Sequence, residues 1–334
     1  MNTLNYIGCK NKLFNNIYSI LQDNIPDIKE KTFSDLFMGT GIVSYNMLEK
    51  CKSIHANDLE TYSFYIGNAI LKCNYSTKLE NIIEDCNNLP EIEGLIYKNY
   101  SPNESCDRMF FTNENAKKGD AIRTYINQLL DSKKINTNEF YFLVASLIVS
   151  IDKVANTTCV YGAYLKTFKE SSKKKLVLNP IHKNTVIKTQ NNIVTNDFAE
   201  KIDYKSDTFD ITYLDPPYNH RAYSSNYFVL NFIANYDPLI IPRGKTGLFD
   251  KNQSDFSKKS KVKEAFINLI NNVKSKYIIL SYNNEGLLSE EELKDILLKK
   301  GKIKLYKIKY NKFKSQKNVK GDFVYEYIWF IDIY

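Results

Sequence analysis

Short apolar segments alternate with stretches of helical spacing at the start of the chain. The segment "KTFSDLF" (31–37) predicts a short strand, which "MGTG" then breaks, and residues 42–50 place apolar side chains on one face of a helix. A second strand is predicted over 52–58 and a second helix over 61–72. Strand, glycine turn, helix and strand in this order indicate a doubly wound, Rossmann-like α/β sheet.

The middle of the chain breaks this alternation. A helix is predicted around 115–130, and the most apolar run, 140–151, is 12 residues long. That run is too short to span a bilayer, so it is interpreted as a buried helix of a protein that does not enter the membrane. We therefore expect two domains: a catalytic domain formed by 1–74 and 184–334, and an inserted, mainly helical domain over 75–183.

The alternation resumes after the insertion. Strands are predicted over 184–191, 209–215 and 276–283. The next helix begins after Ser289, whose spacing to Glu292 fits a capping box, and ends at Gly301. Two long β-rich segments follow, "KIKLYKIKYNKF" and "FVYEYIWFIDIY", and they predict an antiparallel hairpin on the edge of the sheet.

Positive charge is concentrated near the C-terminus. The net charge is +8, and the segment from Lys299 to Lys320 holds ten lysines and no acidic residue. Such a segment suits a polyanion, although solvated lysine faces are common in proteins without one. Lysine supplies 42 of the 46 basic residues, and this bias also fits an A+T-rich gene. The charge pattern alone therefore leaves both interpretations open.

Cysteine and histidine do not form a metal-binding pattern. The six cysteines contain no CxxC pair and the three histidines stand far apart, so no metal site is predicted. The N-terminus lacks the apolar core of a secretory signal, which predicts a reducing cytoplasm. A prokaryotic or phage-encoded source is expected only from the family resemblance described below.

The candidate cofactor loop is "DLFMGTG" (35–41). Gly39 and Gly41 would let the backbone approach a ligand closely, and Asp58 stands where ribose hydroxyls are bound in nucleotide-binding sheets. A G-x-G turn alone is better explained by a tight turn, but its place between strand, helix and strand-end acid favours a ligand. The missing third glycine and Phe37 argue against a pyrophosphate. A nucleoside without phosphates, such as S-adenosyl-L-methionine, fits better.

The candidate catalytic segment is "DPPY", which follows the predicted strand 209–215. Asp215 and the carbonyl of Pro216 could accept the two hydrogens of an aromatic amine and aim its lone pair at a methyl group. Tyr218 would stack on the base, and Pro216 with Pro217 would hold the acceptors rigidly. A simple strand-ending turn is the alternative.

Three other functions compete with transfer to a DNA amine. An RNA or protein N-methyltransferase would share fold and cofactor; that the aspartate in "DPPY" and the long insertion favour DNA adenine is what the family resemblance described next implies. A DNA-binding module without catalysis would not need both motifs. A nicotinamide-dependent oxidoreductase would require the complete dinucleotide-binding motif with its third glycine.

Five motifs together resemble those of the Dam-like D12 class of N6-adenine DNA methyltransferases. They are, in order, "NYIGCK", "DLFMGTG", "NDLE", "NDFAE" and "DPPY". The resemblance covers roughly 1–75 and 184–334, and it departs from the family at Cys9, where serine is usual. It implies that Asp58 holds the cofactor ribose and that Asp215 touches both cofactor and target base. The cofactor-binding residues would be Tyr6, Lys10, Asp35, Phe37, Gly39, Gly41, Asp58, Asp197, Phe198 and Asp215.

Double-stranded DNA is the partner that this resemblance implies. A base inside a duplex cannot reach such a pocket, so base flipping would be required, with residues 219–228 forming a loop over the flipped base. The insertion 75–183 would recognise the target. Its DNA-facing residues would be Asn156, Thr157, Tyr161, Tyr164 and Lys166, with Arg221 beside the catalytic segment. A monomer or weak dimer is expected, and a cognate restriction endonuclease is a candidate partner.

Overall fold

The chain divides into two compact units, each built from segments that are distant in sequence. The computed structural model describes residues 1–187, 191–202, 209–218, 223–249, 254–311 and 323–333. The helical unit comprises Met1–Cys9, Glu60–Gln190 and Tyr223–Asn252. The sheet unit comprises Lys10–Leu59, Asn191–Ala222 and Gln253–Tyr334.

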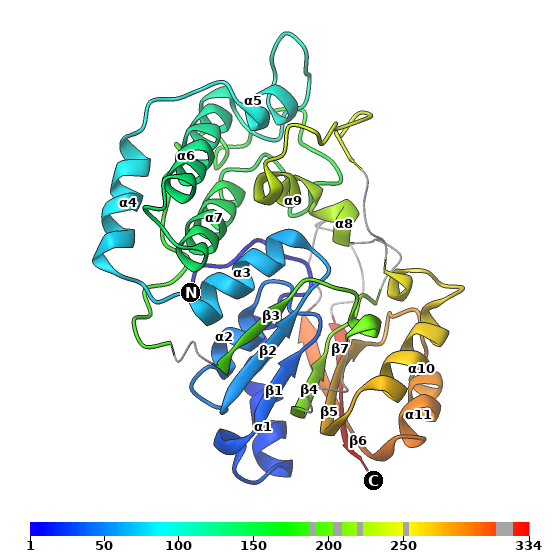
Figure 1. Cartoon of the computed structure of the whole chain (residues 1–334). Helices are drawn as coiled ribbons and strands as arrows, with labels where there is room; N and C mark the ends of the chain where they lie inside the picture. The colour runs from blue at the N-terminus through cyan, green and yellow to red at the C-terminus, as the bar shows by residue number, and fades with distance from the viewer. Residues whose placement is uncertain (188–190, 203–208, 219–222, 250–253, 312–322, 334) are drawn as a thin grey trace. The chain divides into compact units, whose positions relative to one another are not determined.

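The sheet unit is a mixed sheet whose strand order reverses at its centre. The described strands are β1 (Thr32–Asp35), β2 (Ser53–Asn57), β3 (Ile193–Thr195), β4 (Phe209–Leu214), β5 (Ser275–Asn283), β6 (Gly301–Asn311) and β7 (Phe323–Ile333). They lie in the order β3-β2-β1-β4-β5-β7-β6, and Figure 1 shows them together. The first five are parallel, whereas β7 is antiparallel to both β5 and β6. The order reverses between β1 and β4, where open α/β sheets bind ligands.

Helices of the sheet unit supply its core. They are α1 (Phe14–Asn24), α2 (Ile42–Met47), α10 (Val262–Asn272) and α11 (Glu290–Leu298), with 3-10 turns η1 (Lys10–Lys12), η2 (Ile28–Glu30), η4 (Ala199–Lys201) and η5 (Asp255–Ser257). Phe266 of α10 and Leu293 of α11 are fully buried in one cluster with Trp329 of β7. Burying a side chain of this size contributes about 1.5–3 kcal/mol. The predicted capping box of Ser289 and Glu292 is confirmed at the start of α11.

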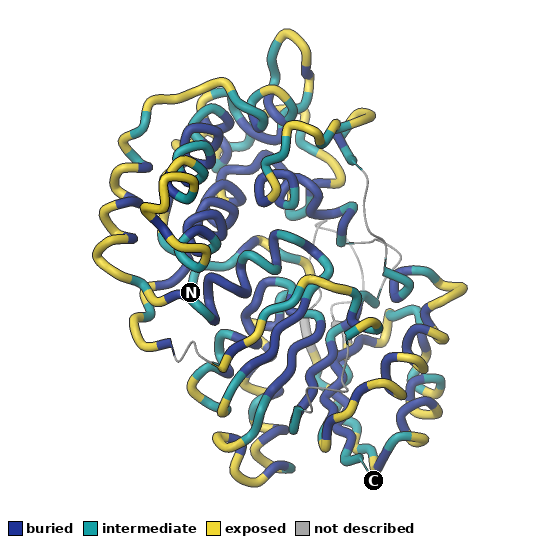
Figure 2. Tube along the Cα trace, in the orientation of Figure 1, coloured by how far each residue is buried: buried dark blue, intermediate teal, exposed yellow. Residues whose placement is uncertain are grey.

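The helical unit is organised around one buried helix. Its helices are α3 (Thr61–Lys72), α4 (Thr77–Asn88), α5 (Leu95–Tyr100), α6 (Asn113–Asp131), α7 (Thr137–Asp152), α8 (Tyr223–Asn226) and α9 (Phe228–Asn235). Helix α7 contains the apolar run predicted as a buried helix, and it packs against α3, α4, α6 and α9. Figure 2 shows α7 buried along most of its length, while α4 exposes one side. Among the described residues, no helix has the length and hydropathy needed to cross a membrane.

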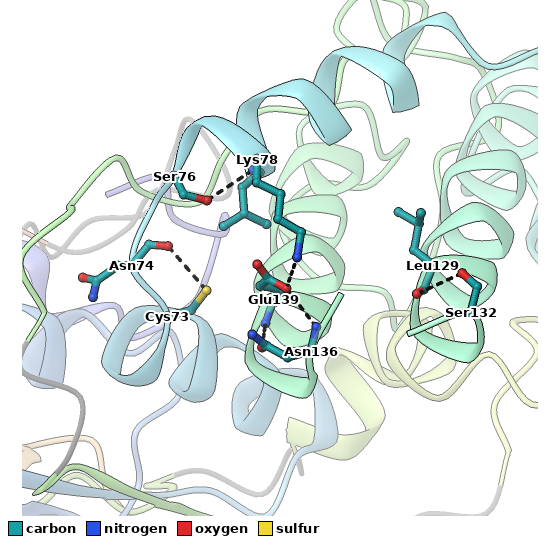
Figure 3. A network of polar contacts seen from close by, with 9 residues as sticks. Cys73, Asn74, Ser76, Lys78, Leu129, Ser132, Asn136 and Glu139 are labelled. Atoms are coloured by element: carbon teal, nitrogen blue, oxygen red, sulfur yellow. Dashed lines mark hydrogen bonds and ion pairs between the residues drawn. The ribbon is translucent and has the colours of Figure 1, made fainter. Parts of the chain in front are cut away.

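Polar contacts fix where α7 begins (Figure 3). The Asn136 side chain accepts the backbone N–H of Glu139, and Glu139 accepts the N–H of Asn136, which forms a capping box. Lys78 of α4 pairs with the same glutamate at 2.7 Å. Capping boxes of this kind satisfy backbone donors that a helix cannot satisfy itself.

Two segments differ in secondary structure from the prediction. Residues 184–187 of the strand predicted over 184–191 form no strand, and residues 188–190 lie outside the described residues. Residues 184–187 bond to the segment after α3: Tyr75 N donates to Asn184 O at 2.9 Å and Ile187 N to Asn74 Oδ1 at 2.6 Å. The strand that follows is β3. The predicted loop over 219–228 contains α8 and the start of α9, while 219–222 lie outside the described residues.

The doubly wound sheet with an antiparallel C-terminal hairpin is confirmed. The helical unit contains the predicted insertion 75–183 and extends beyond it to 1–9, 60–74, 184–190 and 223–252.

Candidate functional site

The glycine loop after β1 is joined directly to the acid after β2. Gly39 and Gly41 have φ angles of 53° and 73°, a left-handed conformation that favours glycine. The backbone N–H of Gly39 donates to Asp58 Oδ2 at 2.7 Å. The loop and the acid, which the sequence predicted to share a ligand, are therefore neighbours at the carboxyl edge of the sheet.

Asp35 ends β1 as a buried carboxyl group. Ser44 of α2 donates to Asp35 Oδ2 at 2.7 Å, whereas Oδ1 has no hydrogen-bond partner among the described residues. Burial raises the pKa of Asp35 to about 7, the Ser44 bond lowers it, and the nearby charges of Asp215 and Asp58 raise it further. A buried acceptor without a partner suits a site that receives a hydrogen-bond donor from a ligand.

Asn57, which the motif analysis did not single out as a functional residue, organises the loops around Asp58. Its side-chain N–H groups donate to Leu36 O at 3.2 Å and to Asp197 O at 3.0 Å. Its Oδ1 accepts from Thr195 Oγ1 at 2.8 Å and from Asp197 N at 3.2 Å. This buried amide therefore links the segments that follow β1 and β3.

The segment after β3 carries two predicted cofactor-binding residues. Asp197 is exposed, and its Oδ1 accepts the backbone N–H of Phe198 at 2.7 Å. The Phe198 ring is half-buried, with Lys201 Nζ 4.4 Å from its centroid. Phe37, from the glycine loop, packs edge-on against Phe256 at 5.2 Å between ring centroids, so it belongs partly to the core.

Asp215 follows β4 and forms an ion pair with a buried lysine. Lys10 Nζ lies 3.1 Å from Asp215 Oδ1 and 2.7 Å from Glu326 Oε1. Burial raises the pKa of Asp215 to about 6; Lys10 lowers it and Glu326 raises it. Burial lowers the pKa of Lys10, but Asp215 and Glu326 outweigh this effect, and the net pKa is well above its ordinary value. Lys10 thus remains charged between two carboxylates.

The rest of the "DPPY" segment is held by backbone and aromatic contacts. Pro216 is buried, and Pro217 and Tyr218 are half-buried. Tyr218 O accepts the N–H of Leu287 at 3.1 Å, and the Tyr218 ring meets Tyr282 edge-on at 6.3 Å. Lys10 Nζ lies 5.6 Å from the centre of the Tyr218 ring. These contacts fix the aromatic side chain beside the Asp215 carboxylate.

Tyr6 belongs to the helical unit. Its ring stacks on Tyr227 at 4.4 Å and on Tyr223 at 5.3 Å, and Tyr62 Oη donates to Tyr6 Oη at 3.0 Å. The structure therefore places Tyr6 in an aromatic cluster of that unit, whereas the other predicted cofactor-binding residues belong to the sheet unit.

Three of the predicted DNA-facing residues are interior side chains. Asn156 is fully buried, and its amide donates to Met109 O and Leu165 O at 3.0 and 2.9 Å. Tyr161 is also fully buried and donates to Asp152 Oδ1 at 2.8 Å, while Thr157 is 5% exposed. A polar side chain that satisfies its hydrogen bonds inside the fold is not presented to a partner, so Asn156 and Tyr161 hold the segment in shape. Thr157 is buried beside them.

Two others remain available at the surface. Tyr164 is half-buried and meets Phe110 edge-on at 5.1 Å, whereas Lys166 is exposed. Arg221 lies outside the described residues. Within the basic segment, Lys302, Lys304, Lys307 and Lys309 of the edge strand β6 are exposed, and Lys307 pairs with Glu290 at 2.7 Å.

The sheet and its edge define a class of enzyme. A glycine loop after β1, an acid after β2 and a rigid Asp-Pro-Pro-Tyr segment after β4 all lie at the carboxyl edge of the parallel strands. They flank the strand-order reversal between β1 and β4 of a Rossmann-like methyltransferase fold.

The chain belongs to the D12 class of N6 adenine-specific DNA methyltransferases, whose family model matches residues 6–296. It is 39% identical to the type II methyltransferase M.CviAII of Paramecium bursaria Chlorella virus 1, covering 100% of this chain and 99% of that protein. It is 39% identical to M.NlaIII of Neisseria lactamica over 98% of this chain and 99% of that protein. M.FokI of Planomicrobium okeanokoites is 36% identical, and the match covers 98% of this chain but 52% of that protein.

Proposed function

We propose that this chain transfers a methyl group from S-adenosyl-L-methionine to N6 of an adenine that is flipped out of duplex DNA. The single observation that carries the proposal is the meeting of the Gly39–Asp58 contact and the Asp215 carboxylate on one sheet edge of a D12-class chain. These features supply a nucleoside-binding loop and an acceptor for an amine.

The residues of the sheet unit fit this cofactor. Asp58 would accept hydrogen bonds from ribose hydroxyls while it holds Gly39, and the left-handed glycines leave the loop without side chains that would block the approach. The buried Oδ1 of Asp35 offers an acceptor that no described residue satisfies. Phe198, half-buried after β3, would lie by the adenine.

The contribution assigned to the chain's own residues is to position the reacting atoms. When bound, the cofactor supplies a methyl group on a positively charged sulfur. Asp215 and the Pro216 carbonyl would accept the N6 hydrogens, so that the N6 lone pair points at the methyl carbon. N6 would form its bond to the methyl carbon as the methyl–sulfur bond breaks, with the electron pair of that bond left on sulfur. The proton that N6 loses would pass to the Asp215 carboxylate and from there to solvent. Tyr218, held by Tyr282, would stack on the base.

Duplex DNA is the substrate assigned to this activity. Target recognition is assigned to the helical unit, with the half-buried Tyr164 and the exposed Lys166 as its candidates. Arg221, three positions after Tyr218 in the sequence, is a further candidate. Because the relatives bear type II methyltransferase names, a cognate endonuclease is the proposed partner, with the enzyme acting as a monomer or weak dimer.

Tritium transfer tests this function. The protein is incubated with methyl-tritiated S-adenosylmethionine and duplex DNA, RNA or protein, and the labelled DNA is digested to nucleosides. Label that appears in N6-methyladenine from duplex DNA supports the proposal, and label confined to RNA or protein refutes it. Long-read sequencing of DNA from an expressing host then shows the sequence context of the modified base.

A further inference from the structure

Glu326 lies outside every motif that pointed to the site, yet it contacts the site's only described buried lysine. It is 6% exposed, lies on β7 opposite Asn283 of β5, and accepts a hydrogen bond from Ser281 Oγ at 3.1 Å. Its Oε1 is 2.7 Å from Lys10 Nζ, which is closer than the 3.1 Å between Lys10 and Asp215. Lys10 is therefore shared between a motif carboxylate and one that no motif contains.

A lysine in this place creates an electrostatic problem for the reaction. During transfer, positive charge develops on N6 next to Asp215, whose carboxylate stabilises it. A positive Nζ about 3 Å from that carboxylate would cancel the stabilisation, and the effect is strong because charges interact more strongly in a buried site than in water. Lys10 is 4% exposed, so solvent does little to screen it.

We infer that Glu326 is a positioning residue that holds Lys10 and offsets its charge, so that Lys10 does not cancel the stabilisation which the ionised Asp215 carboxylate gives to the reacting amine. This inference rests on the proposed adenine methylation. With Glu326 present, two carboxylates share one lysine, and the cluster carries a net charge of −1 when all three groups are ionised. Without it, Lys10 and Asp215 form a neutral pair.

The surroundings of Asp215 support this charge balance. The titratable side chains that interact with Asp215 come from several elements. They are Lys10, Glu326, Tyr213, Tyr218 and Asp35. Burial, first, and then Glu326 raise the pKa of Asp215, whereas Lys10 lowers it. Loss of the Glu326 charge should therefore lower the pKa of Asp215.

The decisive variant is Glu326→Gln, with Glu326→Asp as the conservative variant and Glu290→Gln as the control. Glu290 is half-exposed and pairs with Lys307 on the surface, outside the site. We expect Glu326→Gln to lower kcat about tenfold with nearly unchanged KM for DNA and cofactor, and to move the acid limb of the kcat profile to lower pH. Glu326→Asp should keep the acid limb and recover part of kcat, and Glu290→Gln should match the wild type.

A second readout does not depend on activity. The Asp215 carboxyl carbon is titrated by ¹³C NMR in the protein without substrate, with its signal assigned through Asp215→Asn. A lower Asp215 pKa in Glu326→Gln supports the inference, and an unchanged pKa overturns it. If wild type transfers no methyl group to adenine, the proposed function fails, while this titration still tests the charge balance.

A purely structural role makes different predictions. Equal losses of kcat and melting temperature in Glu326→Gln and Glu326→Asp, with an unmoved acid limb, would overturn the inference. If Glu326→Gln does not fold, the double variant Lys10→Met/Glu326→Gln removes both members of the pair and leaves no extra charge buried. Its kcat should equal that of Lys10→Met, because Glu326 acts through Lys10; a further tenfold loss would contradict this.

Discussion

Replacing Asp58 by alanine should weaken S-adenosylmethionine binding more than replacing it by asparagine. The alanine variant loses both the acceptor of the Gly39 N–H, now at 2.7 Å, and the acceptor offered to the ribose. Hydrogen bonds to charged groups contribute about 1.5–3 kcal/mol, and Asp58 is half-exposed, so the expected loss is about 1–3 kcal/mol. This corresponds to a rise in Kd of about 5- to 150-fold.

Asparagine keeps one oxygen that can accept the Gly39 N–H but loses the negative charge, so its cost should be smaller. Titration calorimetry with S-adenosylmethionine measures both variants beside Asp255→Ala, which removes a surface ion pair with Lys258. The control should bind as the wild type does. An Asp58→Ala protein that keeps its melting temperature and binds within about twofold of wild type would refute the assignment of the ribose contact to Asp58.

Other positions make separate predictions. Asp215→Ala should abolish transfer while cofactor binding stays measurable, and near wild-type turnover would contradict its role as the amine acceptor. In the wild-type protein, burial raises the pKa of Asp215 to about 6, so turnover should fall as pH drops through that value and the carboxylate is protonated; a profile that stays flat down to about pH 5 would argue against this. Tyr218→Ala should cost more kcat than Tyr218→Phe, since stacking needs the ring and not the hydroxyl; equal losses would assign the role to the hydroxyl. Asn156→Ala should lower the free energy of unfolding by about 1–3 kcal/mol in denaturant titration, because its buried amide bonds would be lost. Lys166→Ala should leave stability unchanged and lower the salt slope of DNA binding by up to about 0.9 if that lysine contacts a phosphate.

Much of the sheet could be predicted because its signals are local. Strands β1, β2, β4 and β5 are short apolar runs bounded by turns, and α11 begins at a capping box readable from two residues. The strand predicted over 184–191 was misplaced, because the sequence of residues 184–187 suits strand pairing as well as that of β3 does. Hydrogen bonds to Asn74 and Tyr75, which are distant in sequence, decide the conformation of residues 184–187.

The motifs locate the candidate site, but they do not reveal every residue that contacts it. Asn57 lies inside "NDLE", from which only Asp58 was singled out, and no spacing rule connects Glu326 to Lys10, 316 positions earlier. Asn156 and Tyr161 were predicted to face DNA, yet both are buried and hydrogen-bonded. A single sequence gives the polarity of such residues but not their partners.

The helical unit is assembled from three separate stretches of chain, and this affects how target specificity could be exchanged among relatives. The chain passes between units after Cys9, Leu59, Gln190, Ala222 and Asn252. The second passage comes directly after the Asp58 segment, and the fourth comes four residues after Tyr218. A recombination event that transplanted only 75–183 would carry one part of the helical unit without its other two, so the helices would meet foreign partners in their core. Chimeric enzymes should therefore fold only when all three stretches come from one parent, which ties the inheritance of the helical unit, proposed to recognise the target, to that of the flanking catalytic motifs.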